Sequence, residues 1–143
     1  MIKLNDLCIS LPETWAVHPF DKIILGSRVN ERLGVLQILL GHKDIFQSMP
    51  KHDECINIVF KFMSKNKLPS DKNNIFQQTH GNCCLVGAFA YYDKDSLERV
   101  YYKYINNKFI LAVYKSKNYQ SNKDGVLDEI DESDSIIESI YFE

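Results

Sequence analysis

The chain has 143 residues, of which 45% are hydrophobic and 25% charged, and its formal net charge is −2. This balance is typical of one globular domain with a single core, so we expect one domain over residues 1–143 and exclude the disordered and fibrous classes. The near-neutral charge argues against binding to nucleic acid, because such proteins gather Lys and Arg on one surface.

No targeting or membrane segment is predicted. No apolar run approaches the roughly 18–20 residues that a membrane-spanning helix needs, and Asp6 and Glu13 interrupt the stretch where a leader peptide would be continuously apolar. The four cysteines are too few and too irregularly spaced for a disulfide framework. We therefore expect reduced thiols and a cytoplasmic location.

The first half of the chain predicts three strands and a helix. The alternation in LCISLP (7–12) indicates a half-buried strand, and the apolar runs at 23–29 and 33–42 flank a polar Asn-Glu-Arg turn, which indicates a hairpin. The segment 53–65 fits both a helix and a strand; we favour a helix, because Ser and Pro precede it and two acidic residues suit its first turn. Residues 64–74 are then expected to be a loop.

The second half predicts four strands, a helix and a last strand. Strands are expected at 75–79 and 84–92, and the runs 97–105 and 108–116 meet at an Asn-Asn pair that suits a tight hairpin. From Asp124 the apolar spacing becomes helical, and the apolar residues at 139–142 indicate a short final strand. The expected fold class is α+β, a mainly antiparallel sheet flanked by helices.

The stretch HGNCC (80–84) is a candidate thiol site. A thiol enzyme needs a nucleophilic cysteine, a histidine base and an orienting Asn or Asp, and His80, Asn82, Cys83 and Cys84 supply these types. The residues after Cys84 are rich in strand formers, however, and free cysteines are commonly buried. We favour packing residues in a strand and expect no catalytic residue here.

Zinc is a second possible chemistry. His52 and Cys55 form one His-x-x-Cys pair, and His80 and Cys83 form another, so together they could supply two nitrogens and two thiolates. Established zinc modules use Cys-x-x-Cys or His-x-x-x-His pairs, which this sequence lacks. We therefore expect no metal and no other cofactor.

The predicted C-terminal helix is strongly acidic, with seven Asp and Glu between Asp124 and Glu138. The spacing of a calcium-binding loop is absent. Two interpretations remain: a solvated helix face, or a negative surface that docks a basic partner. The candidate partner-binding residues on this helix are Asp128, Asp131, Glu132 and Asp134.

Tyrosines are frequent in the predicted hairpin 97–116. Successive strand residues point to opposite faces, so this hairpin places aromatic side chains on both faces of the sheet. Either both faces are covered, or one face exposes tyrosines, a residue type enriched at protein interfaces. On the second interpretation, Tyr102, Tyr104 and Tyr114 join the candidate partner-binding surface.

The order of segments suggests a family. An opening strand that closes in LPETW, a hairpin IILGSRVNERLGVLQILL, a middle helix, a meander CLVGAFAYY…VYYKYINNKFILAVYKS and a final helix running into ESIYF together resemble the PsbP-like α/β/α sandwich family. The family includes photosystem extrinsic subunits, a Ran-GTPase-binding factor and bacterial chaperones for effectors of contact-dependent secretion. The resemblance implies a non-enzymatic domain that binds another protein.

Two functional hypotheses follow. The first is a small bacterial protein-binding module, such as an immunity protein, adaptor or effector chaperone, whose partner is a toxin or secreted effector. The alternative is a thiol- or zinc-dependent enzyme that uses His80, Cys83, Cys84, His52 and Cys55. Zinc analysis of the purified protein, with and without Cys83→Ser, distinguishes the two.

Overall fold

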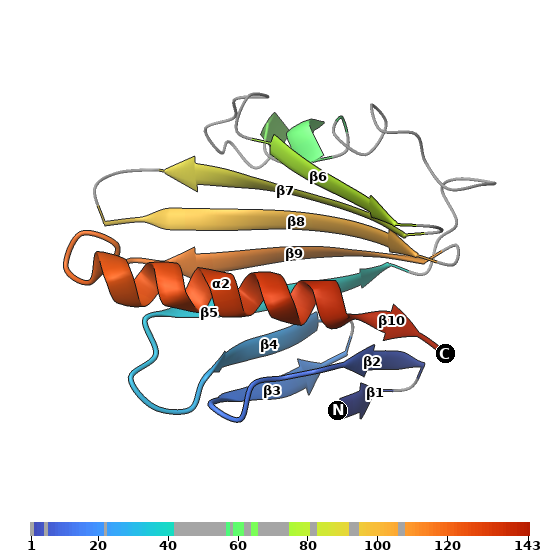
Figure 1. Ribbon diagram of the computed structural model, residues 1–143, viewed down its shortest axis with the longest axis horizontal. Helices are drawn as coiled ribbons and strands as arrows, with labels where there is room; N and C mark the ends of the chain where they lie inside the picture. Colours follow the sequence, from blue (N-terminus) through green and yellow to red (C-terminus); the bar gives the residue numbers. More distant parts are fainter. Residues whose placement is uncertain are drawn as a thin grey trace.

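Within its described residues, the computed structural model contains two antiparallel β-sheets, one of three strands and one of seven, and a long C-terminal helix that packs on the larger sheet (Figure 1). It describes residues 2–4, 6–21, 23–41, 57, 59–61, 64–65, 75–80, 83–91, 95–105 and 108–143. Side chains are described within these ranges, except at 40–41, 75–80 and 83–91.

The small sheet has the order β1-β2-β10, and the large sheet has the order β3-β4-β5-β9-β8-β7-β6. The elements are β1 (Ile2–Leu4), β2 (Leu7–Ile9), β3 (Trp15–Phe20), β4 (Ile23–Arg28), β5 (Gly34–Gly41), β6 (Ile75–His80), β7 (Cys83–Tyr91), β8 (Leu97–Ile105), β9 (Lys108–Ser116), α2 (Lys123–Ser139) and β10 (Tyr141–Phe142). Residues 57, 59–61 and 64–65 are also helical. The fold is α+β, as the sequence predicts.

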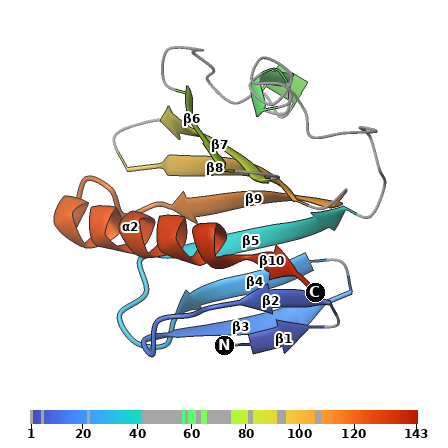
Figure 2. The same ribbon diagram turned by 45° about the vertical axis from the view of Figure 1, so that its right-hand side comes forward.

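Helix α2 and the small sheet form one layer against one face of the large sheet (Figure 2). The helix contacts strands β5, β8 and β9 of the large sheet and β2 of the small one. The core lies between the two layers and is formed by buried side chains from both: Leu7, Ile9, Trp15, Ile24, Leu36, Ile38, Leu97, Tyr101, Ile110, Ala112, Tyr114, Val126, Ile130, Ile136, Ile137, Ile140 and Phe142.

The two predicted hairpins are confirmed. Strands β4 and β5 pair from Ile23↔Leu39 to Gly26↔Leu36, and β8 and β9 pair along their whole length to Ile105↔Lys108. The Asn-Asn pair expected to form the turn, 106–107, lies outside the described residues. The predicted strands at 75–79 and 84–92 are β6 and β7, within one residue at each end. Strand β7 is second from the β6 edge of the sheet.

Two strands were not predicted. β1 has three residues, which is too short for an alternating pattern to be recognised. β3 contains Pro19, which removes a backbone donor, and it forms one edge of the large sheet. Proline is tolerated at such an edge, because one side of the strand has no ladder to maintain.

The middle helix is supported where the chain is described. Residues 57, 59–61 and 64–65 are helical rather than extended, and Val59 is fully buried. Residues 64 and 65 are helical, whereas the loop was expected to begin at residue 64. The remainder of the expected loop, 66–74, lies outside the described residues.

Candidate functional site

Helix α2 carries the strongest functional signal of the sequence, and its start is set by a local cap. The side chain of Asn122 accepts a hydrogen bond from the Gly125 N–H at 3.1 Å, and Asp124 lies in the first turn. Both features stabilise a helix N-terminus, where backbone donors lack partners and the dipole is positive. The face toward the core carries Val126, Glu129, Ile130, Ser133, Ile136 and Ile137.

One of the acidic side chains, Glu129, lies in the core. Its carboxylate is fully buried and accepts hydrogen bonds from the backbone N–H groups of Leu33 (2.7 Å) and Gly34 (3.1 Å) and from the Tyr114 hydroxyl (3.0 Å). The Arg28 guanidinium lies 3.9 Å away. Glu129 therefore ties α2 to the start of β5 and to β9, and it meets the rule that a buried charge must be paired and hydrogen-bonded.

A close approach of two strands builds this pocket for Glu129. A Cβ atom on Gly34 would lie 2.5 Å from the Lys115 carbonyl oxygen and from the ring of Tyr114. Only glycine therefore lets Tyr114 pass beside β5 and reach the carboxylate. Burial and the negative Glu129 together raise the pKa of Tyr114, so its hydroxyl stays protonated and donates.

A second inward carboxylate, Glu132, pairs with Arg28 on β4. The guanidinium binds both oxygens, with Nε–Oε2 at 3.0 Å and Nη2–Oε1 at 2.7 Å, and the indole N–H of Trp15 donates to Oε2. Bidentate charged pairs of this geometry are among the stronger hydrogen-bonded contacts in proteins. The pair links α2 to β3 and β4.

The third inward carboxylate, Asp134, pairs with strand β8. Arg99 approaches it with Nε and Nη2 at 3.2 Å from the two oxygens, and the Tyr101 hydroxyl also donates to it. Burial, followed by the charge of Asp134, raises the pKa of Tyr101. One turn further, the buried Lys103 ammonium donates to the carbonyls of Ile137, Glu138 and Ile140 at 2.9, 2.7 and 2.7 Å. Strand β8 therefore binds both the acidic face and the C-terminus of α2.

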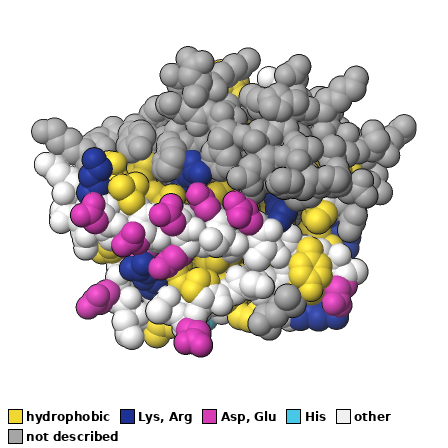
Figure 3. All heavy atoms as spheres, viewed as in Figure 1, with side chains coloured by type: hydrophobic (Ala, Val, Ile, Leu, Met, Phe, Trp, Pro, Cys, Tyr) yellow, Lys and Arg dark blue, Asp and Glu magenta, His cyan; other side chains and the backbone are white. Residues whose placement is uncertain are grey.

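These three residues, Glu129, Glu132 and Asp134, are called the inward acids below. The other four acidic residues of the helix are exposed and are called the outward acids: Asp124, Asp128, Asp131 and Glu138. Acidic side chains follow the line of α2 on the molecular surface (Figure 3). Within the described residues, the outward acids form no ion pair.

The predicted tyrosine surface is wrong. Tyr102, Tyr104 and Tyr114 are 0%, 2% and 0% exposed, so none of them is available to a partner. The physical reason is that the strand is covered on both faces: in β8, every residue from Leu97 to Tyr104 is buried. Of the predicted helix residues, Asp128 and Asp131 are exposed, whereas Glu132 and Asp134 are half-buried in ion pairs.

The candidate thiol and zinc residues lie largely outside the described part. His80 and Cys83 are directly opposite each other where β6 meets β7, and Cys84 pairs with Thr79. Their side chains, and His52 and Cys55 altogether, lie outside the described residues. Within the described residues, no three His, Cys, Asp or Glu side chains gather as a metal-binding group, and no helix is both long and apolar enough to cross a membrane.

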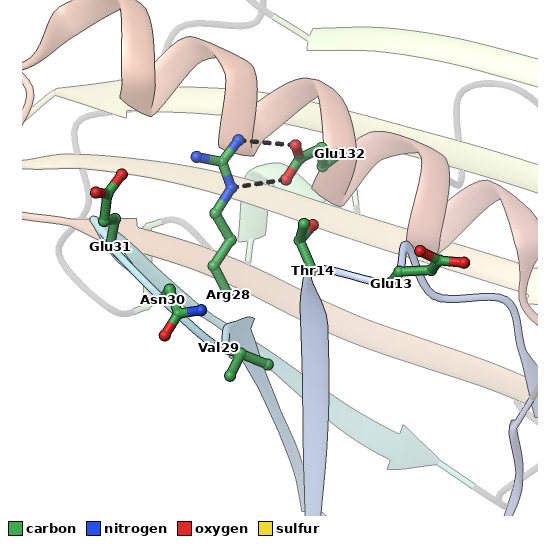
Figure 4. Close-up of a pocket in the computed structure, with 7 residues that line it drawn as sticks. All are labelled: Glu13, Thr14, Arg28, Val29, Asn30, Glu31 and Glu132. Carbon is green, nitrogen blue, oxygen red and sulfur yellow. Dashed lines mark hydrogen bonds and ion pairs between the residues drawn. The ribbon is translucent and has the colours of Figure 1, made fainter.

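A surface hollow of about 550 Å³ opens between α2 and two turns of the large sheet (Figure 4). The residues lining it are Glu13, Thr14, Arg28, Val29, Asn30, Glu31 and Glu132. Sequence analysis did not find it, because its residues come from three distant segments. Glu13 and Glu31 are exposed and, within the described residues, form no ion pair; Val29 is 63% exposed.

The ion pair at the hollow predicts an acid-sensitive contribution to stability. The hydrogen bond from Arg28 lowers the pKa of Glu132 from its ordinary value near 4.5, and this outweighs the opposing effect of partial burial. A lowered pKa gives stability that is present above the ordinary value and lost as the pH falls through the lowered one. We expect the free energy of unfolding, measured with urea, to fall less steeply below about pH 4.5 in Glu132→Gln than in wild type. Equal slopes would show that this pair adds no acid sensitivity.

Two solved structures share the architecture. The solution structure of cyanobacterial PsbP (CyanoP) from Synechocystis sp. PCC 6803 aligns with a TM-score of 0.58 and 8% identity, covering 99% of this chain and 95% of that one. The fold is PsbP-like. At this identity the likeness shows the fold alone.

This chain also aligns with part of a larger protein. A crystal structure from Bacteroides thetaiotaomicron VPI-5482 matches over 96% of this chain with a TM-score of 0.57 and 8% identity. This chain spans 45% of the length of that protein. Neither the known protein families nor the curated proteins provide a sequence match.

Proposed function

We propose that the chain is a non-enzymatic protein-binding module of the bacterial cytoplasm, of the immunity, adaptor or effector-chaperone kind. The outward acids of α2 dock the basic surface of its partner, a toxin or secreted effector. The observation that carries this proposal is the division of one helix into an acidic face paired with the sheet and an acidic face without ion pairs in the described part of the chain.

Electrostatic repulsion among the outward acids supports a role in binding. Asp124 and Asp128 are four residues apart, and Asp128 and Asp131 are three apart, so like charges are neighbours on the helix surface. Such pairs destabilise a helix by about 0.2–0.5 kcal/mol each. Asp124 stabilises the helix N-terminus, but Asp131 and Glu138 form no ion pair within the described residues, and a basic partner would relieve the repulsion among the outward acids.

The charge of this face would act mainly on encounter. Exposed charges at an interface steer association and exclude wrong partners more than they add affinity. The PsbP-like fold supports the proposal by analogy, because the resemblance implies domains that bind other proteins; a fold does not by itself determine function.

Capture from native lysate, with a charge-matched control, tests the proposal. The outward pair variant, Asp128→Asn with Asp131→Asn, removes two charges from α2. The control pair variant, Asp21→Asn with Glu143→Gln, removes two exposed charges elsewhere. We expect the outward pair variant to retain at least about 5-fold less of a partner that the control pair variant and wild type hold equally, with the difference shrinking at high salt. Equal retention by both variants would contradict the proposal.

A further inference from the structure

We propose that the hollow beside Arg28 is the specificity pocket of this surface, and that it binds a lysine or arginine side chain from a basic segment of the partner protein. The inference rests on the proposed function and names the part of the partner that is recognised. The hollow has a volume of about 550 Å³, within the range of roughly 300–1,000 Å³ that is typical of binding pockets. It can therefore hold a long side chain together with the residue beside it.

The charge of the lining selects a cation. The lining carries three carboxylates, from Glu13, Glu31 and Glu132, and one guanidinium, from Arg28, which pairs with Glu132. The Glu132 carboxylate accepts hydrogen bonds from Arg28 and Trp15. The charge of Arg28 is neutralised by Glu132, and the Glu129 carboxylate also lies near it. The unused charge of the hollow is that of Glu13 and Glu31, so an incoming anion would be repelled and an incoming cation attracted.

The lining also suits the shape of a basic side chain. Lys and Arg carry a long apolar stem and a charged head, and the stem packs on apolar surface while the head reaches polar groups. Val29 offers an exposed apolar surface in the hollow, between the turn that carries Glu13 and the position of Glu31. Glu13 and Glu31 lie at opposite ends of the hollow (Figure 4), so a stem crossing Val29 could direct its head to either end.

The walls of the hollow are tied together, so the pocket is preformed. The Val29 N–H donates to the Thr14 carbonyl at 2.8 Å, which joins the turn before β3 to the end of β4. The ion pair between Arg28 and Glu132 joins the same strand to α2. A preformed pocket loses little conformational entropy when it binds, which favours affinity for a flexible basic segment.

Titration with a short peptide, followed by the backbone amide signals in NMR spectra, tests the pocket without the natural partner. The probe is a blocked peptide with two lysines on either side of a valine, and the comparison peptide carries glutamates in place of the lysines. We expect saturable shifts at Thr14, Val29, Asn30 and Glu31 with a dissociation constant on the order of 1 mM for the basic peptide, and none for the acidic one.

The variant Glu13→Gln with Glu31→Gln removes the unused charges and should raise this dissociation constant about 5-fold or more. The control pair variant has the same net charge and should bind as wild type does. Three results would overturn the pocket: shifts spread along α2 instead, no saturable binding, or an unchanged dissociation constant in the Gln variant. If the outward pair variant loses the partner but the basic peptide does not bind at the hollow, the pocket is rejected and the docking face is kept. If the outward pair variant captures the partner as well as wild type does but the basic peptide binds at the hollow, the docking face is rejected and the pocket is kept.

Discussion

Replacing Glu129 with glutamine is expected to lower the free energy of unfolding by about 2–4 kcal/mol. The buried carboxylate accepts from two backbone N–H groups and from the Tyr114 hydroxyl, and it faces Arg28. An amide has only one acceptor oxygen, so its NH₂ group must face at least one of these donors. The substitution also removes the negative charge that faces the Arg28 guanidinium.

Glu138→Gln is the matched control, because it makes the same chemical change on the same helix at an exposed site. Its expected effect is within about 0.5 kcal/mol of wild type. Urea unfolding of both variants, followed by circular dichroism, measures the difference. If the two variants are equally stable, Glu129 is not the anchor of α2.

The second large effect is expected from Lys103→Met, which should lower the free energy of unfolding by about 2–4 kcal/mol. Methionine can fill the buried space of the lysine stem, but it donates no hydrogen bond. The carbonyls of Ile137, Glu138 and Ile140 would lose the ammonium that caps the helix C-terminus. Because β10 follows directly, its pairing with β2 through Phe142 and Leu7 should also weaken.

Lys117→Met serves as the control, since Lys117 is exposed. Hydrogen exchange localises the effect: the Glu143 amide, which donates to the Asp6 carbonyl at 2.8 Å directly after β10, should exchange faster in Lys103→Met, relative to the amides of β9, and should be unchanged in Lys117→Met. Uniformly faster exchange across the chain would indicate a general loss of stability and not a loosened helix end.

The β8–β9 hairpin and α2 were predictable because each depends on local sequence. An Asn-Asn pair between two runs rich in strand-forming residues specifies a hairpin, and the apolar spacing after Asp124 specifies a helix. β3 was missed because Pro19 weakens its pattern, and only its place at a sheet edge explains why proline is accepted there.

The division of the acidic residues of α2 into buried and exposed ones could be predicted in part from the sequence. Glu129 falls within the apolar stripe, between Val126 and Ser133, which is an unusual place for an unpaired charge. Arg99 and Lys103 lie on the same face of β8 as Tyr101, because alternate residues of a strand share a face. These buried charges indicate that each needs a partner, but not which one: Arg99 pairs with Asp134 and Lys103 with helix carbonyls, whereas Glu129 binds groups of β5 and β9. The pairing of Arg28 with Glu132 brings together residues 104 positions apart, and no local pattern reveals it.

The two covered faces explain why the tyrosines were misassigned. Alternation correctly places Tyr101 and Tyr102 on opposite faces, but it does not show whether a second layer covers each face. Burial of both residues shows that both faces are covered at this strand. The candidate surface therefore reduces to the outward acids and the adjoining hollow.

The rate of association with the captured partner tests the docking role of the outward acids most directly. In the outward pair variant, we expect the association rate constant at low salt to fall about 10-fold relative to the control pair variant, with little change in the dissociation rate. Raising the salt concentration should bring the two association rates together, because it screens the charges that steer the encounter. Equal association rates for the two variants at low salt would contradict the account.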